Sequence, residues 1–249
     1  MNFLPVYSRE LRSYFTSPVA YVVMLFFILL TAIFFMVFIG DFNMASMNQE
    51  SPYGGGYNLN ITYRVVRPLL GHMSVVMLFV LPLITMKPFA EERKSGTMEL
   101  LFTFPLSDLD ILLGKFLAAL TLFLVLLSLT LLFPAFMYLH SSPETGTLIS
   151  GYLGLVLMSA AFISLGLFIS SLTENQIIAA VGTFGMLLIF WIIEFTGTNQ
   201  LLRHLSILEH FNNFAEGVID TRDVLYYLSF MLLWLFMTLR VLESKKWRS

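Results

Sequence analysis

Long uninterrupted apolar stretches dominate the pattern of this chain. Six of them lie close to the roughly 20 residues that a helix needs to cross a bilayer core. To within a few residues they cover 19–39, 68–86, 116–139, 151–172, 177–195 and 224–242. An isolated strand would leave its backbone polar groups unsatisfied in lipid, so all six are expected to be helices. The pattern predicts an all-α integral membrane protein with six transmembrane helices in one domain, 19–243, and a short tail, 244–249.

The first 18 residues show a different, amphipathic pattern. Phe3, Leu4, Tyr7, Leu11, Tyr14 and Phe15 share one helical face, whereas Ser8, Arg9, Arg12 and Ser13 fall elsewhere. This spacing predicts an interfacial helix over 1–18 that lies along the cytoplasmic membrane surface and ends near Pro18. Its charges also interrupt the apolar region that a signal peptide would need, so the first span is expected to be an uncleaved anchor.

The connections between the spans differ in character. Residues 41–67 contain SPYGGGYN and are predicted to be a long external loop. Only about four polar residues, 173–176, separate the fourth and fifth spans, so these form a tight hairpin. Small residues such as Gly166 and Gly182 allow close helix packing there. Apolar residues recur at helical spacing within 197–222, which predicts one or two short external re-entrant helices before the last span.

Charge distribution gives the orientation. The chain is 57% hydrophobic and 12% charged, with a mean hydropathy of +0.81. Of its 14 Lys and Arg residues, ten fall on the side of the N-terminus and four on the other. Basic residues in short loops favour the cytoplasmic side. We therefore expect a multi-pass protein of a bacterial-type cytoplasmic (inner) membrane with both termini in the cytoplasm.

Enzyme signatures are missing from the sequence. Without cysteine there is no disulfide or thiol catalysis, and no glycine-rich phosphate loop is present to bind ATP. The four histidines are scattered, and His204, Glu209 and His210 have poor metal-ligand spacing, so they are expected to be exposed polar residues. The sequence predicts no catalytic residue, no metal, no cofactor in this chain and no nucleic-acid partner.

Two acidic features remain open. The adjacent Glu91 and Glu92 are similar to the glutamate pair of membrane-embedded CAAX-type proteases, but Gly96 stands where those enzymes have arginine, which disfavours an intramembrane protease. Glu194 lies inside the fifth apolar stretch, where a carboxylate is costly and indicates a translocation path. Because it is near a helix end, it can also simply reach the interface.

The segment 87–115, KPFAEERKSGTMELLFTFPLSDLDILLGK, combines the densest charge with apolar residues. Met98, Leu101 and Phe102 share one face of a short helix that Pro105 ends. Ser107 and Asp110 form a pattern similar to a capping box at the start of the third span. A short helix with apolar faces and a charged end suits contact with the membrane domain on one side and a cytoplasmic partner on the other.

Several of these residues together resemble the signature of ABC-2-type transporter permeases. They are Glu91, Glu92, Ser95-Gly96-Thr97, Glu99-Leu100-Leu101, Pro105, Ser107 and Gly114-Lys115. Within that family the chain is most similar to gliding-motility and nitrous-oxide-reductase-maturation permeases. The resemblance implies a coupling helix between spans two and three, and a second permease chain as a homo- or heterodimer. It also implies two copies of a separate ABC ATPase that binds ATP and Mg²⁺ and drives export.

The resemblance also implies which residues meet the ATPase. These are Glu91, Glu92, Arg93, Lys94, Gly96, Thr97, Glu99, Leu101, Thr173, Glu174 and Asn175. Spans two and five, with the external helices and Glu194, are expected to line the path. A membrane scaffold of a surface or motility machine driven by the same ATPase is an alternative function. A secondary carrier would show more buried charge at mid-membrane.

Overall fold

The protein is described here by a computed structural model, which places residues 3–49, 60–97, 107–193 and 204–246. Within these ranges every regular element is helical. The elements are α1 (Leu4–Thr16), α2 (Pro18–Gln49), the π-helix η1 (Thr62–Val66), α3 (Arg67–Thr85), α4 (Ala90–Lys94), α6 (Asp108–Thr130), α7 (Leu132–His140), α8 (Thr145–Leu172), α9 (Gln176–Ile192), α11 (Ile207–Ala215) and α12 (Thr221–Lys246).

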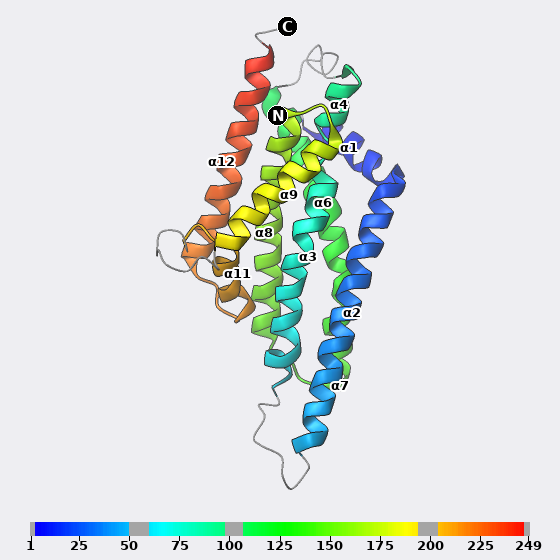
Figure 1. The fold of residues 1–249 in the computed structure, drawn as a ribbon, viewed down its shortest axis with the longest axis vertical. Coiled ribbons are helices and arrows are strands. Elements are labelled where there is room, and N and C mark those ends of the chain that lie inside the picture. The colour runs from blue at the N-terminus through cyan, green and yellow to red at the C-terminus, as the bar shows by residue number, and fades with distance from the viewer. Residues whose placement is uncertain (1–2, 50–59, 98–106, 194–203, 247–249) are drawn as a thin grey trace.

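The long helices run side by side along the longest axis of the molecule, and α1 lies obliquely across them (Figure 1). Both ends of the chain and α4 are at the same end of this bundle. Five stretches of the described chain are long and apolar enough to cross a membrane. The expected fifth span corresponds to α9, an apolar helix of 17 residues that begins one residue earlier than predicted.

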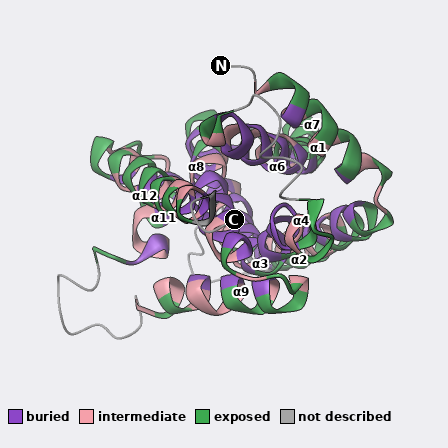
Figure 2. Ribbon diagram, turned by 90° about the horizontal axis from the view of Figure 1, so that it is seen from above, coloured by how far each residue is buried: buried purple, intermediate pink, exposed green. Residues whose placement is uncertain are grey.

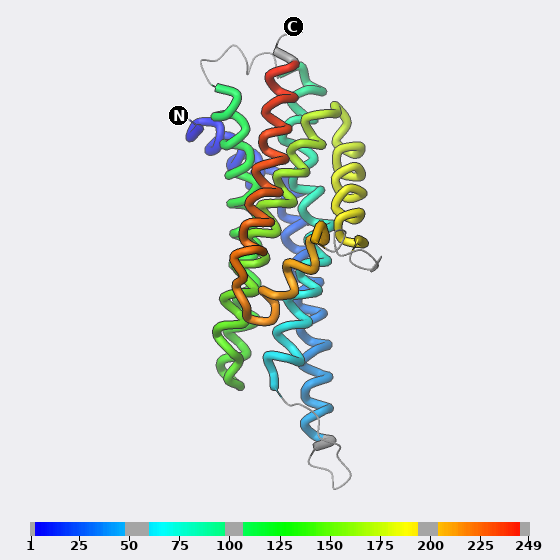
Figure 3. Tube along the Cα trace, turned by 90° about the vertical axis from the view of Figure 1, so that its left-hand side faces the viewer, coloured from blue at the N-terminus to red at the C-terminus, as the bar shows by residue number. Residues whose placement is uncertain are grey.

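The predicted external loop over 41–67 is wrong at both ends. Helix α2 continues to Gln49, and helical structure resumes at Thr62. No proline follows Gly40 until Pro52, and the intervening residues include the good helix formers Met44, Ala45 and Met47. The helix therefore continues beyond the apolar stretch. Figure 3 shows the far end of α2 projecting past its neighbours.

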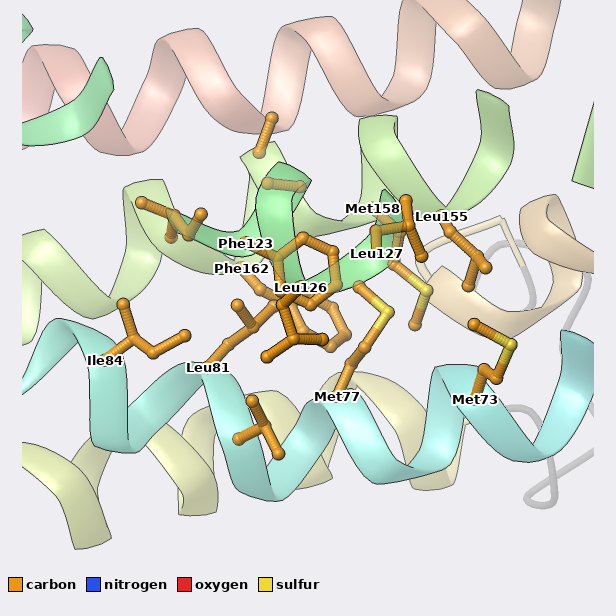
Figure 4. Close-up of a cluster of buried hydrophobic side chains, with 14 of the residues drawn as sticks. Met73, Met77, Leu81, Ile84, Phe123, Leu126, Leu127, Leu155, Met158 and Phe162 are labelled. Atoms are coloured by element: carbon orange, nitrogen blue, oxygen red, sulfur yellow. The ribbon is translucent and has the colours of Figure 1, made fainter. Parts of the chain in front are cut away.

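The core is formed where α3, α6 and α8 meet (Figure 4). Met77 and Leu81 of α3 point toward Phe123 of α6 and Phe162 of α8, and all four are buried. Figure 2 shows α8 near the middle of the bundle and mostly buried. The three helices thus share one hydrophobic centre, around which α2, α9 and α12 pack.

Small residues allow α8 to pack closely against other helices. Its close neighbours include α3 and α11 as well as α9, its partner in the predicted hairpin. A Cβ on Gly166 would collide with Oγ1 of Thr85 in α3, and one on Gly154 would lie 2.6 Å from Cβ of Phe214 in α11. Within the predicted hairpin, a Cβ on Gly182 of α9 would lie 3.1 Å from Ile169. Residues 173–175 join the two helices, so the tight hairpin is confirmed.

One short helix, α11, lies within the region 197–222, and the prediction for 197–203 falls outside the described residues. Ser206 caps it by accepting a hydrogen bond from the Glu209 backbone amide at 3.3 Å. The expectation that His210 is an exposed loop residue is wrong, because its Nδ1 lies 2.6 Å from Oδ1 of the buried Asp223. The helix places this ring against the start of α12, where it stacks on Tyr226.

Candidate functional site

Helix α1 is held tightly against the bundle at the end that carries α4. It crosses α6 at Gly114, where a Cβ would lie 2.8 Å from Cβ of Val6 and 3.1 Å from the backbone nitrogen of Tyr7. Tyr14 donates a hydrogen bond to the Ile84 carbonyl of α3 at 3.1 Å. The predicted amphipathic helix is therefore confirmed as a helix, and it is fastened to two others. Its place on a membrane surface stays a prediction.

A buried ion cluster joins α1, α4 and α6. Nζ of Lys115 in α6, whose side chain is 0% exposed, lies 2.9 Å from a carboxylate oxygen of Glu10 in α1 and 2.9 Å from one of Glu92 in α4. It also donates to the Pro88 carbonyl at 2.6 Å. A buried ammonium is costly unless it is paired, so these three acceptors are what make its position tolerable.

Arg9 completes this ion cluster from the solvent side. Its guanidinium lies 2.8 Å from Glu10 and 2.5 Å from Glu92, and it is half exposed. Burial by itself would raise the pKa of Glu10, but the positive charges of Lys115 and Arg9 outweigh burial and lower that pKa. The cluster thus brings together two basic side chains, Arg9 and Lys115, and two acidic ones, Glu10 and Glu92.

Helix α4 is also bound to the turn between α8 and α9. Ser170 accepts hydrogen bonds from the backbone amides of Phe89 at 3.3 Å and Ala90 at 3.1 Å, and donates to the Met86 carbonyl at 3.1 Å. Arg93 donates to the Ser171 carbonyl at 3.1 Å and pairs with Glu174 at 3.3 Å. These contacts hold the chain segment between α3 and α4, together with α4 itself, against the C-terminal end of α8.

The structure therefore brings together the two segments that were predicted to contact an ATPase. Six of the predicted residues are exposed at this end of the molecule, and we call them the predicted docking surface: Glu91, Lys94, Gly96, Thr97, Glu174 and Asn175. Thr173 is half-buried, Arg93 lies beneath the surface as a link, and Glu92 turns inward to the ion cluster. Gly96 has a φ of 68°, a left-handed conformation that favours glycine. Glu99, Leu101 and Glu194 fall outside the described residues.

Four contributors to this end of the molecule were not predicted as site residues: Arg9, Glu10, Lys115 and Ser170. In the sequence, Glu10 and Arg9 stand out only as charges on an interfacial helix, and Ser170 only as part of an apolar span. Lys115 did carry a signal, since it directly precedes the predicted span 116–139, where an ammonium that is drawn toward the membrane needs partners. Among the described residues no group of His, Asp and Glu side chains is arranged to hold a metal ion.

Comparison with known proteins adds the family. The family described as ABC-2 family transporter protein matches residues 41–203, which include α3, α4, α6, α7, α8 and α9. The chain belongs to this family. Membership agrees with a multi-pass membrane protein that carries α4 between its second and third long helices.

Two curated relatives share part of the sequence. Both are named "Probable multidrug ABC transporter permease YbhR", one from Escherichia coli strain K12 and one from Escherichia coli O157:H7. Each is 28% identical to this ABC-2 protein over 139 residues, or 55% of this chain. The matched region spans 36% of the length of these relatives.

Proposed function

We propose that this chain is the permease subunit of an ATP-driven ABC-2-type exporter, which forms the translocation path with a second permease chain. In this proposal two copies of a separate ABC ATPase bind ATP and Mg²⁺ and dock at the cytoplasmic end of the bundle. Both termini then lie in the cytoplasm of a cell with an inner membrane. Family membership and the curated relatives support this function.

The observation that carries the proposal is the docking surface formed by α4 and the α8–α9 turn. It is exposed, yet its underside is bound to several helices: Arg93 and Ser170 hold α8, and Glu92 holds α1 and α6 through the ion cluster. A force on α4 would therefore be passed directly to more than one span. This is what a permease needs in order to turn ATPase closure into relative movement of its helices.

The ion cluster decides which residue is suitable for a test of ATPase docking. Reversing the charge of Glu92 would disrupt its pairs with Lys115 and Arg9 before it affected any partner, so Glu92 is a poor probe of docking. Lys94 is better, because it is exposed and no described residue forms an ion pair or side-chain hydrogen bond with it. A control is Asp41, an exposed charge in the far half of α2.

The experiment purifies the tagged full chain from its native membranes and measures the P-loop ATPase that accompanies it. We expect such an ATPase with the wild type, and about a tenfold decrease with Lys94→Glu, equivalent to ~1.4 kcal/mol of contact energy. Asp41→Lys should retain it. If no P-loop ATPase accompanies the wild type, the proposed function is wrong. If both variants retain the ATPase equally, α4 does not contribute to the contact with it.

A further inference from the structure

A cavity of about 230 Å³, whose lining includes several charged and hydroxyl-bearing side chains, lies between α1 and the chain from Lys87 to Glu92 at the start of α4. The ion cluster forms part of its wall, and Ser13, Ser17, Lys87 and Glu91 form the rest of its polar lining. Its volume is below the roughly 300–1,000 Å³ of pockets for drug-sized ligands. The cavity therefore suits a small polar group.

Two opposite charges in the cavity wall are left without ionic partners. Arg9, Glu10 and Glu92 neutralise one another together with Lys115. By contrast, Lys87 contacts only Oγ of Ser17, at 3.1 Å, and no basic side chain of the described chain pairs with Glu91. The cavity thus offers one free cation and one free anion, counted over the described residues.

An apolar seam begins at the same place. Tyr14, Ser17 and Lys87 also border a crevice between α2 and α3 whose other lining residues include Val19, Val23 and Leu83. Its internal volume is only about 10 Å³, so it does not enclose a ligand. Val19 and Leu83 are each 38% exposed at its mouth, where a hydrocarbon chain can lie along the surface.

From this arrangement we propose that the cavity binds the head group of a phospholipid that carries a zwitterionic primary amine, a phosphoethanolamine. The phosphate lies by Lys87 and the hydroxyls of Ser13 and Ser17, the ammonium lies by Glu91, and an acyl chain follows the seam past Val19. A primary ammonium donates hydrogen bonds to a carboxylate, whereas a trimethylammonium cannot. A phosphatidylglycerol head group carries the same phosphate but has no cation to place beside Glu91.

This lipid site requires α1 to lie at a membrane surface, but it does not depend on ATPase docking. Bound there, the lipid would add contacts between α1 and the segment after α3 that the protein alone does not make. It would thereby fasten α1 to α4 beside the ion cluster.

The test equilibrates the purified full chain with mixed micelles of phosphatidylethanolamine, phosphatidylcholine and phosphatidylglycerol of equal acyl composition. Retained lipid is then counted by native mass spectrometry. We expect phosphatidylethanolamine to be retained about fivefold more than either competitor, the scale of one partly exposed ion pair. Glu91→Gln should abolish its advantage over phosphatidylcholine, and Lys87→Gln should weaken retention of phosphatidylethanolamine.

The matched control is Lys94→Gln, which changes a charge on α4 outside the cavity and should leave the preference intact. Circular dichroism of each variant confirms that it is folded.

Equal retention of the three lipids, or a preference that survives Glu91→Gln, would overturn the site. Water-soluble glycerophosphoethanolamine should bind more weakly than the lipid; equal binding would contradict the role of the seam. No ATPase is present in this measurement, so its failure and that of the proposed function are separately observed.

Discussion

At each end of the bundle a contact between an acidic and a basic side chain holds a short helix, but the two contacts connect different parts of the chain. At the α4 end, Lys115 pairs with Glu10 across a sequence separation of 105 residues, and Arg9 pairs with Glu92 across 83. At the α11 end, His210 pairs with Asp223 across only 13. The first arrangement ties three distant segments into one unit, whereas the second stabilises one local helical corner. The α4 end therefore connects distant parts of the chain, whereas the α11 end connects neighbouring ones.

The largest expected effect comes from Lys115→Ala. Removal of the ammonium leaves Glu10 and Glu92 as neighbouring carboxylates with Arg9 alone, and breaking a buried ion pair costs about 3–5 kcal/mol of unfolding free energy. Unfolding in mixed detergent micelles measures it. Hydrogen exchange should increase in both α1 and α4, which would confirm the long-range connection. Lys94→Ala, at an exposed position, should change little, and a matching loss there would contradict the assignment.

A local effect is expected from Asp223→Ala at the other end. It removes the acceptor of His210 and of Asn213, whose Nδ2 donates to Oδ2 of Asp223 at 2.8 Å. Loss of such charged hydrogen bonds costs roughly 1.5–3 kcal/mol. Hydrogen exchange should rise within α11 and at the start of α12 but stay unchanged in α1. An increase throughout the bundle would show that this end is as widely connected as the other.

Gly114→Ala tests whether close approach or charge holds α1 in place. Because the added Cβ would meet Val6 at 2.8 Å, α1 must shift, and overpacking of this kind costs roughly 1–3 kcal/mol. Faster exchange confined to α1 is the expected readout. Gly185→Ala in α9 is the control, since no atom lies within 4 Å of the position that its methyl group would take, and the change should not destabilise the fold. Equal behaviour of the two variants would argue against a tight crossing.

The smallest effect is the pH dependence of the α4 end. The pKa of Glu10 is lower in the folded protein than in the unfolded chain, so its contribution is fully present above the ordinary carboxyl range, near about 4.3. It is lost as the pH falls through the lower folded pKa. Protection of α1 against exchange should therefore decline only below about pH 4. Glu10→Gln should remove that decline, and an unchanged profile would assign it to another group.

Local signals in the sequence were sufficient for much of the helical architecture. Ser107 was predicted to cap α6, and it does: its hydroxyl accepts from the Asp110 amide at 3.1 Å and donates to the Asp110 carboxylate at 2.6 Å. The length of α2 was not predictable from hydropathy. Apolar content indicates which part of a helix lies in the membrane core, but the helix itself continues until a helix-breaking residue ends it. Residues up to Gln49 contain no such break.

The candidate site was predictable only in part for a similar reason. The charged run at Glu91 to Lys94 and the turn at 173–175 were visible as separate segments of polar sequence. Their meeting through Arg93, and the pairing of Lys115 with Glu10, depend on how α1, α6 and α8 pack in three dimensions. No periodicity along the chain encodes such a contact.

The position of Lys115 also sets an order of events during synthesis. Glu10 is translated 105 residues before its partner. At the roughly 5–20 residues per second of a ribosome, that interval is about 5–20 s. Throughout it, Glu10 has its neighbour Arg9 as a partner but not Lys115, so the complete ion cluster forms only after the start of the third long helix has been made. A chain interrupted before Lys115 would therefore lack the ammonium that joins α1, α4 and the segment between α3 and α4.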